Sequence, residues 1–237
     1  MRYLALMSPR IIPLWPLPFA VAVILMVAVH LAWWISVQTG YIPFCVPYLE
    51  GCTSISRAAR HGLGNHLFRL MVLPCALLVA ANWWSAREWL RTPEGRAGER
   101  IFLVLGLVSA FALAVYATFL GTEGETYRFL RRYGVTVFFG FGFLAQLGFM
   151  HLAMRQGRLP RRLSVGMTSV CVVMLALGVV SVASTFALSD AAHDRVENAL
   201  EWQLGLLLVI WFALQAWAWH GDGYAIRFTR GVPENKD

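Results

Sequence analysis

Residues 51–69, GCTSISRAARHGLGNHLFR, bring three arginines, two histidines and three hydroxyl side chains into one short stretch of an otherwise apolar chain. Serine and histidine together can perform acyl transfer, in which the histidine takes the serine proton and an acid orients the histidine. In such a site Ser56 would be the nucleophile and His61 or His66 the base. No nucleophile-elbow motif surrounds Ser56, so this interpretation depends on residue types alone.

The same stretch could instead hold a phosphate-bearing headgroup. Guanidinium groups form charge-assisted, often bidentate hydrogen bonds to phosphate, and serine hydroxyls add further donors. The predicted binding residues in this stretch are Ser54, Arg57, Arg60 and Arg69. The alternative is a basic loop that only rests on anionic lipid headgroups, which would need no pocket.

Two acids far along the chain, Asp194 and Glu201, could orient the histidine of a catalytic set. Glu201 stands in the string ENALEWQ, directly before Trp202 and a long apolar run. This position predicts that Glu201 opens the last membrane helix, at the depth of Arg69, with which it could pair. Acids near a helix N-terminus also complement the helix dipole, so a structural role is the alternative. His193, Asp194 and Trp202 complete the predicted substrate-binding residues.

The histidines suit a metal site less well. His61, His66 and His193 could supply neutral imidazole ligands, but none lies in an HExxH-type array. His30 and His151 are expected near opposite faces of the membrane, which argues against a haem held between two helices. We predict no metal and no cofactor.

Six apolar stretches must position these polar residues. The chain is 58% hydrophobic and only 14% charged, with a mean hydropathy of +0.59, which is typical of a polytopic membrane protein. Each stretch is long enough to cross about 30 Å of hydrocarbon as a helix. The stretches are about 17–36, 67–84, 101–120, 135–154, 164–188 and 202–219. The sequence therefore predicts an all-α protein: one domain, 1–237, forming a single bundle of six transmembrane helices.

The distribution of Lys and Arg predicts the orientation. Thirteen of the 20 lie in the N-terminal segment, the second and fourth connections and the C-terminal tail, and seven lie in or beside the other three connections. The positive-inside bias therefore places both termini in the cytoplasm and the 37–66 loop outside. The same bias accounts for most of the net charge of +7, so we predict no nucleic-acid partner.

The first outer connection is about 30 residues long, roughly twice the others, which favours a lid or an interfacial loop. Cys45 and Cys52 lie seven positions apart in it and could form a disulfide in an oxidising compartment. Spacing alone leaves this bond open, because it does not determine the Cβ geometry. Cys75 and Cys171 lie within predicted spans, as buried thiols.

Three strings together resemble the Frag/DRAM/Sfk family of membrane proteins. They are TSISRA in the first outer loop, HLFR at the second helix, and the acid–aromatic pair EW at the last helix. The most similar branch contains post-GPI-attachment-to-proteins factor two and the N-terminal domain of the Cwh proteins. The residues that match the family pattern by position are Ser54, Ile55, Ser56, Arg69, Glu201 and Trp202. The resemblance implies a six-helix protein that remodels or distributes lipids, although many members follow the serine motif with an acid and prolines instead of arginines.

We therefore expect an integral membrane protein that binds or remodels a phosphate-bearing lipid or glycolipid at its outer face. An acyltransferase or lipid hydrolase is the alternative, and a lipid transporter, scramblase or non-catalytic scaffold is the next. Ion-coupled transport is disfavoured because the spans carry no acid or base well inside, and we expect the mid-span Gln146 to hydrogen-bond within the bundle. The partners would be anionic or phosphate-bearing lipids, in the inner membrane of a bacterium or the ER/Golgi-type membranes of a eukaryote.

Overall fold

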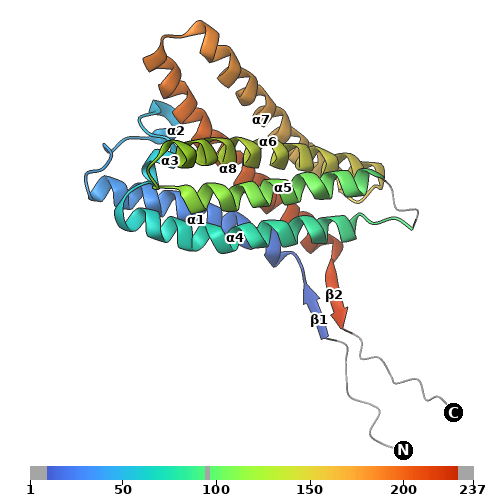
Figure 1. Cartoon of the computed structure of the whole chain (residues 1–237). Helices are drawn as coiled ribbons and strands as arrows, with labels where there is room; N and C mark the ends of the chain where they lie inside the picture. The colour runs from blue at the N-terminus through green and yellow to red at the C-terminus, as the bar shows by residue number, and fades with distance from the viewer. Residues whose placement is uncertain (1–9, 94–96, 229–237) are drawn as a thin grey trace, which may run out of the picture.

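A computed structural model describes residues 10–93 and 97–228. Six helices in this part of the chain are long and apolar enough to cross a membrane, and they pack as one bundle (Figure 1). They are α1 (Pro16–Gln38), α4 (Gly62–Trp89), α5 (Ala97–Phe119), α6 (Glu125–Arg155), α7 (Arg161–Ala187) and α8 (Asp190–Asp222). The predicted all-α, six-helix membrane bundle is confirmed, and the chain is a multi-pass integral membrane protein.

Three of these helices begin well before the predicted spans. α4 begins five residues early, α6 ten and α8 twelve, so polar turns extend each helix past its apolar segment. At 1.5 Å per residue, the early part of α6 adds about 15 Å. Helical hydrogen bonding can continue past an apolar segment because the helix satisfies its own backbone groups and polar side chains are solvated outside hydrocarbon. The prediction that Glu201 opens the last helix is therefore wrong: it lies about three turns inside α8.

The connection between α1 and α4 contains two one-turn helices, α2 (Pro47–Glu50) and α3 (Ile55–Ala58). Because α4 begins at Gly62, His66 belongs to a helix and not to the predicted 37–66 loop, and Arg69, predicted near the end of a span, lies about two turns inside α4. Figure 1 shows α2 and α3 at the end of the bundle away from the strands. The long loop is thus a folded cap over one end of the helices.

A two-stranded antiparallel ribbon, which the sequence did not predict, joins the first and last described segments. β1 (Arg10–Pro13) pairs with β2 (Ala225–Phe228), with Ile12 opposite Ile226. β1 precedes α1 and β2 follows α8, so the ribbon projects from the end of the bundle opposite the cap (Figure 1). Which end faces the cytoplasm stays a prediction. Some of the basic residues on which this prediction is based lie outside the described part of the chain: Arg2, Arg96, Arg230 and Lys236.

Glycines let α5 and α6 approach closely. A Cβ on Gly148 would lie 2.7 Å from the Phe102 Cβ, and one on Gly142 would lie 2.9 Å from the Ser109 hydroxyl. Larger side chains at these positions would force the helices apart. Gly140 meets open space instead, because it faces a groove described below.

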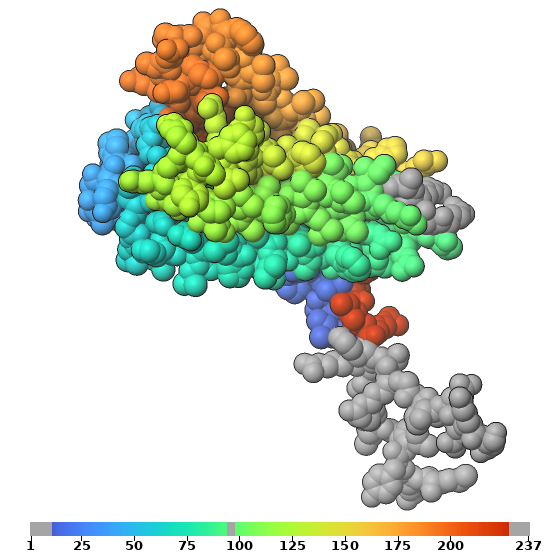
Figure 2. Space-filling model, in the orientation of Figure 1, coloured from blue at the N-terminus to red at the C-terminus, as the bar shows by residue number. Residues whose placement is uncertain are grey.

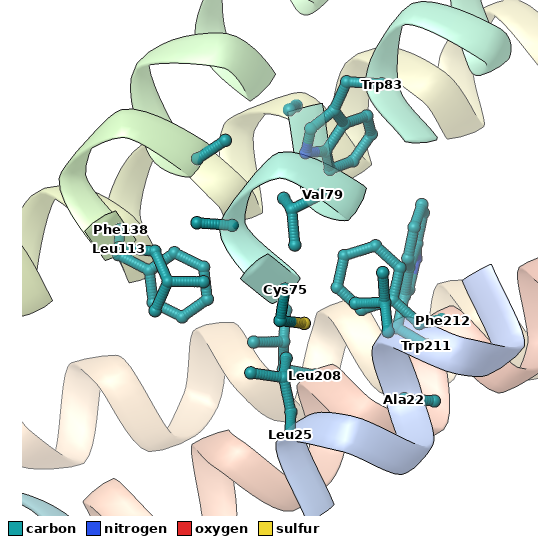
Figure 3. Close-up of a cluster of buried hydrophobic side chains, with 14 of the residues drawn as sticks. Ala22, Leu25, Cys75, Val79, Trp83, Leu113, Phe138, Leu208, Trp211 and Phe212 are labelled. Atoms are coloured by element: carbon teal, nitrogen blue, oxygen red, sulfur yellow. The ribbon is translucent and has the colours of Figure 1, made fainter. Parts of the chain in front are cut away.

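The centre of the bundle is packed around α4. Cys75 and Val79 are fully buried there, among leucine and aromatic side chains from four other helices (Figure 3). Gln146 is also fully buried, but neither of its side-chain polar atoms has a hydrogen-bond partner among the described residues. The prediction that Gln146 hydrogen-bonds within the bundle is therefore wrong. Two other buried amides, Asn82 and Gln215, bond to each other at 3.1 Å.

The outside of the bundle is apolar, as a lipid-facing surface requires. α7 contributes much of it, because it packs along α8 and stands away from the rest of the bundle at the cap end (Figures 1 and 2). Its exposed side chains include Val172, Leu175, Val179, Val182 and Phe186. Part of this surface borders the groove between α6 and α7.

Candidate functional site

The cap is fastened to α8 by side chains from successive turns of that helix. Each bonds to a backbone group of the loop: Asn198 to the Gly51 carbonyl at 2.9 Å, Trp202 to the Thr53 carbonyl at 2.9 Å, Gln203 to the Tyr48 carbonyl at 2.8 Å, and Glu201 to the Ser56 amide at 3.3 Å. Polar residues just before an apolar span are thus used to hold the cap in place.

Two further features stiffen this cap. Cys45 and Cys52 form a disulfide with a Cα–Cα distance of 6.6 Å, so the possible bond identified from the sequence is present. Gly51 has a φ of 59° and lies so close to the Arg195 carbonyl that a Cβ could not fit. Only glycine combines this backbone conformation with this approach.

Under the cap, Ser56 meets an acid and a phenol. Its hydroxyl lies 2.9 Å from the Tyr116 hydroxyl and 3.4 Å from a Glu201 carboxylate oxygen, which also accepts from the Ser56 backbone N–H. α3 supplies the serine, α5 the tyrosine and α8 the acid. Residues 60 and 145 positions from Ser56 in sequence therefore form one hydrogen-bonded cluster.

This cluster lies at the polar end of an apolar cavity of about 60 Å³ in the middle of the bundle. The walls come from α1, α4, α5, α6 and α8, with Tyr48 of α2 and Ile55 of α3, and Glu201 is the single charged residue among them. Leu25, Leu113, Phe138 and Leu208 contribute to the walls and belong to the buried core seen in Figure 3. The cavity is therefore suited to hydrocarbon, with hydrogen-bonding groups at one end only.

A larger apolar groove of about 520 Å³ runs between α6, α7 and α8. Gly140 and Gly178 form part of its floor and walls, and Phe139 lines both this groove and the central cavity. In Figure 2 the atoms of α7 (orange) stand away from those of the N-terminal half of α6 (yellow-green). Phe139 therefore lies between the groove on the surface of the bundle and the cavity that holds the cluster at one end.

A second hydrogen-bonded group borders the cavity on its α1 side. The His30 Nδ1 atom lies 2.7 Å from the Met26 carbonyl, so Nδ1 carries a proton and Nε2 accepts from the Tyr48 hydroxyl at 3.0 Å. Burial raises the pKa of Tyr48, which keeps its hydroxyl protonated as this bond requires. Trp202 packs against both rings. This arrangement is structural, because every polar atom in it has a partner.

The predicted serine–histidine–acid set is not assembled. His61 stacks on Tyr41 at 5.0 Å and His66 is exposed on α4, and neither bonds to Ser56. His193 bonds to Ser184 at 2.9 Å and lies 3.3 Å from Glu197, within the α7–α8 hairpin. His61 and His66 are close enough to Ser56 along the chain to have reached it. The one-turn helix α3 instead directs the Ser56 hydroxyl toward Tyr116 and Glu201.

The predicted Arg69–Glu201 pair is also absent. Within residues 10–93 and 97–228, no ion pair joins them, and Glu201 bonds to Ser56. Ser54 caps α3 by accepting from the Arg57 N–H at 3.1 Å. Trp202, predicted to bind substrate, is buried against the cap and also lines the cavity.

The remaining predicted binding residues lie in two surface hollows. Arg57 and Asp194 line one where the cap meets α8. Arg60 and His61 line the other, a cleft of about 350 Å³ between the end of the cap and the α5–α6 connection. This second hollow, here called the basic cleft, is lined by Arg60, His61, Gly121, Thr122, Glu123, Gly124, Glu125, Arg128 and Arg131.

Three residues of these sites were not predicted from the sequence: Tyr116, Arg128 and Arg131. A tyrosine near the outer end of an apolar span and a basic third connection were the signals available for them. Comparison with family models, curated proteins and solved structures finds no match for this chain. A cluster of three or more His, Cys, Asp or Glu residues suited to a metal ion is absent from the described part of the chain.

Proposed function

We propose that this protein binds a membrane lipid at its outer face, with a hydrocarbon chain between the helices and a phosphate-bearing headgroup, of a phospholipid or glycolipid, beside the cap. The observation that carries the proposal is the cavity with one polar end, where Ser56, Tyr116 and Glu201 meet above walls of hydrocarbon side chains. Such a cavity suits a molecule that is apolar along most of its length and polar at one end.

Access from the bilayer supports a lipid over a water-soluble ligand. The groove between α6 and α7 is apolar, and it shares Phe139 with the central cavity. A chain can lie in this groove and reach toward the cluster by displacing a few side chains. The resemblance to the Frag/DRAM/Sfk family favours lipid remodelling as the wider role.

Lipid analysis of a cavity-filling variant tests the proposal. Gly205 lines the cavity, and a Cβ there would lie 3.2 Å from the Ile55 side chain, so Gly205→Leu fills the space under the cluster. Gly221→Leu is the matched control, because Gly221 lies on the same helix with nothing within 4 Å of a Cβ. After purification in mild detergent, mass spectrometry should find a retained lipid in the wild type and Gly221→Leu and much less in Gly205→Leu. Equal lipid content in all three would contradict the proposal.

A second candidate function, acyl transfer, is favoured by the contact between Ser56 and Glu201. In that reaction the serine oxygen attacks the ester carbonyl of a bound lipid while Glu201 takes the serine proton, and Tyr116 donates to the developing oxyanion. The lipid alcohol leaves with the proton from Glu201, and water or another alcohol then takes the acyl group from Ser56.

An active-site probe separates this candidate from simple binding. A fluorophosphonate should label the wild type at Ser56 and fail to label Ser56→Ala, while lipid retention stays unchanged in the variant. Ser54→Ala is the control, because the Ser54 hydroxyl already caps α3. Absence of labelling in a protein that retains lipid would leave binding as the function.

A further inference from the structure

We propose that the basic cleft binds the phosphate group of the lipid, with Arg60 and Arg131 as its principal ligands. This inference rests on the proposed function and specifies the headgroup chemistry, a phosphate ester with at least one free anionic oxygen. The ligand source is the outer leaflet, although free phosphate presents the same chemistry.

Charge in the cleft is unevenly compensated. Three guanidinium groups and two carboxylates line it, and one carboxylate, Glu125, pairs with Arg128. Within the described parts of the chain, neither Arg60 nor Arg131 lies in an ion pair. Two like charges facing one cleft repel each other, and an anion between them would remove that repulsion.

The donors of these two arginines are largely unused. Arg131 donates one long hydrogen bond, 3.3 Å, to the Thr122 carbonyl. The Arg60 Nε is buried without any partner among the described residues. Buried donors normally find acceptors, so an anion that reaches Arg60 would give this donor the partner that the described part of the chain does not supply. A phosphate oxygen is an acceptor of the required charge.

The walls of the cleft are held in place before any ligand arrives. The buried amide of Asn65 donates to the Ala59 carbonyl at 2.9 Å and to the Leu120 carbonyl at 3.0 Å, which joins the cap to the end of α5. Gly121, with a φ of 85°, brings the chain so close that a Cβ would lie 2.8 Å from the Arg60 carbonyl. A preformed cleft loses less entropy on binding than a flexible loop.

The N-terminus of α6 adds partial positive charge to the basic cleft. Its N-cap residue is Gly124, which has no side chain to cap the first amides, and the helix continues for 31 residues. Helix N-termini favour anions through these free N–H groups and the helix dipole. This turn belongs to the polar extension of α6, about 15 Å long, which precedes the apolar span of that helix.

The cleft also lies next to the Ser56 cluster. Arg60 follows Ser56 by four residues. Gly134 lies one turn after Arg131 on α6, and a Cβ on it would lie 3.1 Å from the Tyr116 backbone nitrogen. A phosphate in the cleft would place the attached glycerol or sugar near the cluster and the chain in the cavity below it.

Ligand binding by charge-neutral variants tests the inference. The probes are dioctanoyl phosphatidylglycerol and dioctanoylglycerol, which lacks the phosphate, added to protein in a neutral maltoside detergent. Arg60→Gln and Arg131→Gln should each weaken phosphatidylglycerol binding at least tenfold and leave dioctanoylglycerol binding unchanged. Arg132→Gln is the matched control, because Arg132 is an exposed neighbour on α6 that does not line the cleft, and its affinity should change less than twofold.

Other outcomes are equally decisive. Wild-type affinity in Arg60→Gln and Arg131→Gln, or an equal loss in Arg132→Gln, would overturn the cleft. If a glutamine variant does not fold, Arg131→Lys keeps the charge without the bidentate geometry and should still weaken binding severalfold. Inorganic phosphate should compete with phosphatidylglycerol in the wild type but not in Arg131→Gln. This result would identify the anion site even if Gly205→Leu leaves lipid binding intact. In that case the chain cavity fails and the cleft stands.

Discussion

Ser56 and Glu201 illustrate how a single polar contact can have two roles. The Glu201 carboxylate accepts from both the backbone N–H and the hydroxyl of Ser56, so it anchors the cap and also makes the serine hydroxyl a hydrogen-bond donor at the cavity. Arg69 takes no part in this contact. The structural role follows directly from the geometry, and a chemical role would require the substrate to displace the Tyr116 hydroxyl.

Stability measurements on Glu201 test this assignment. Glu201→Ala leaves the Ser56 N–H without its acceptor and should cost about 1–3 kcal/mol. Glu201→Gln keeps an acceptor oxygen and should cost less. A double-mutant cycle with Arg69→Ala, measured by thermal unfolding in detergent, should be additive within about 0.5 kcal/mol because the two side chains do not pair. A coupling well above that would mean that they do meet.

At the scale of elements, the cap is a folded layer that depends on α8. Its own helices are only four residues each, too short to be stable alone. The side chains of Asn198, Trp202 and Gln203 supply the hydrogen bonds that its backbone carbonyls lack. Movement of the first turns of α8 should therefore move the cap, and the cap covers the polar end of the cavity.

Replacement of one anchoring side chain should loosen the cap without unfolding the bundle. Trp202→Phe keeps most of the buried ring but removes the bond to the Thr53 carbonyl, at a cost of about 1 kcal/mol. Hydrogen exchange of residues 46–58 should become faster, while exchange in α4 and α5 stays the same. Trp217→Phe, at an exposed position of the same helix, should change neither. Unchanged exchange in Trp202→Phe would show that this bond does not hold the cap.

The Cys45–Cys52 disulfide should stabilise the same cap. Cross-linking over a separation of seven residues restricts the unfolded chain, and removing such a bond costs roughly 2–3 kcal/mol. Peptide mapping without reductant should recover the linked pair, and Cys45→Ala/Cys52→Ala should lower the unfolding temperature. Cys75→Ala is a poor control because that thiol is buried, so the comparison is wild-type protein with and without dithiothreitol.

At the scale of the whole molecule, the structure has a polar capped end and a second end that carries the strand ribbon. Each long helix passes once between these ends, so six helices return the chain to the side on which it started (Figure 1). The proposed lipid site belongs to the capped end. Its biological setting, periplasm or organelle lumen, therefore depends on the orientation that the Lys and Arg distribution predicts.

Cysteine labelling can measure this orientation with little background. Two native cysteines are buried and two are joined in the disulfide, so an introduced thiol should dominate the signal. A membrane-impermeant maleimide added to intact cells should label Glu123→Cys, near the cap, and should not label Arg161→Cys, at the other end, until the membrane is opened. The reverse pattern would invert the predicted topology and place the site in the cytoplasm.

The sequence by itself determined the six-helix membrane architecture, because a span of apolar residues long enough to cross hydrocarbon must form a helix wherever it occurs. It also identified the long first connection, Ser56 and Glu201 as features of interest, from their residue types and their places along the chain. The possible disulfide could be identified in the same way, since both cysteines belong to one short loop. These inferences need only local information.

The partners of those residues were decided by the tertiary structure alone. Glu201 could have met Arg69, and Ser56 could have met His61 or His66, because sequence indicates depth in the membrane but not the rotation of each helix about its axis. Close packing of α5 on α6 through glycines, and the one-turn helix α3, brought Tyr116 to Ser56 and placed Arg131 in the same cleft as Arg60. Rotation and approach depend on side chains from several helices packing at once, and no single segment of the sequence contains that information.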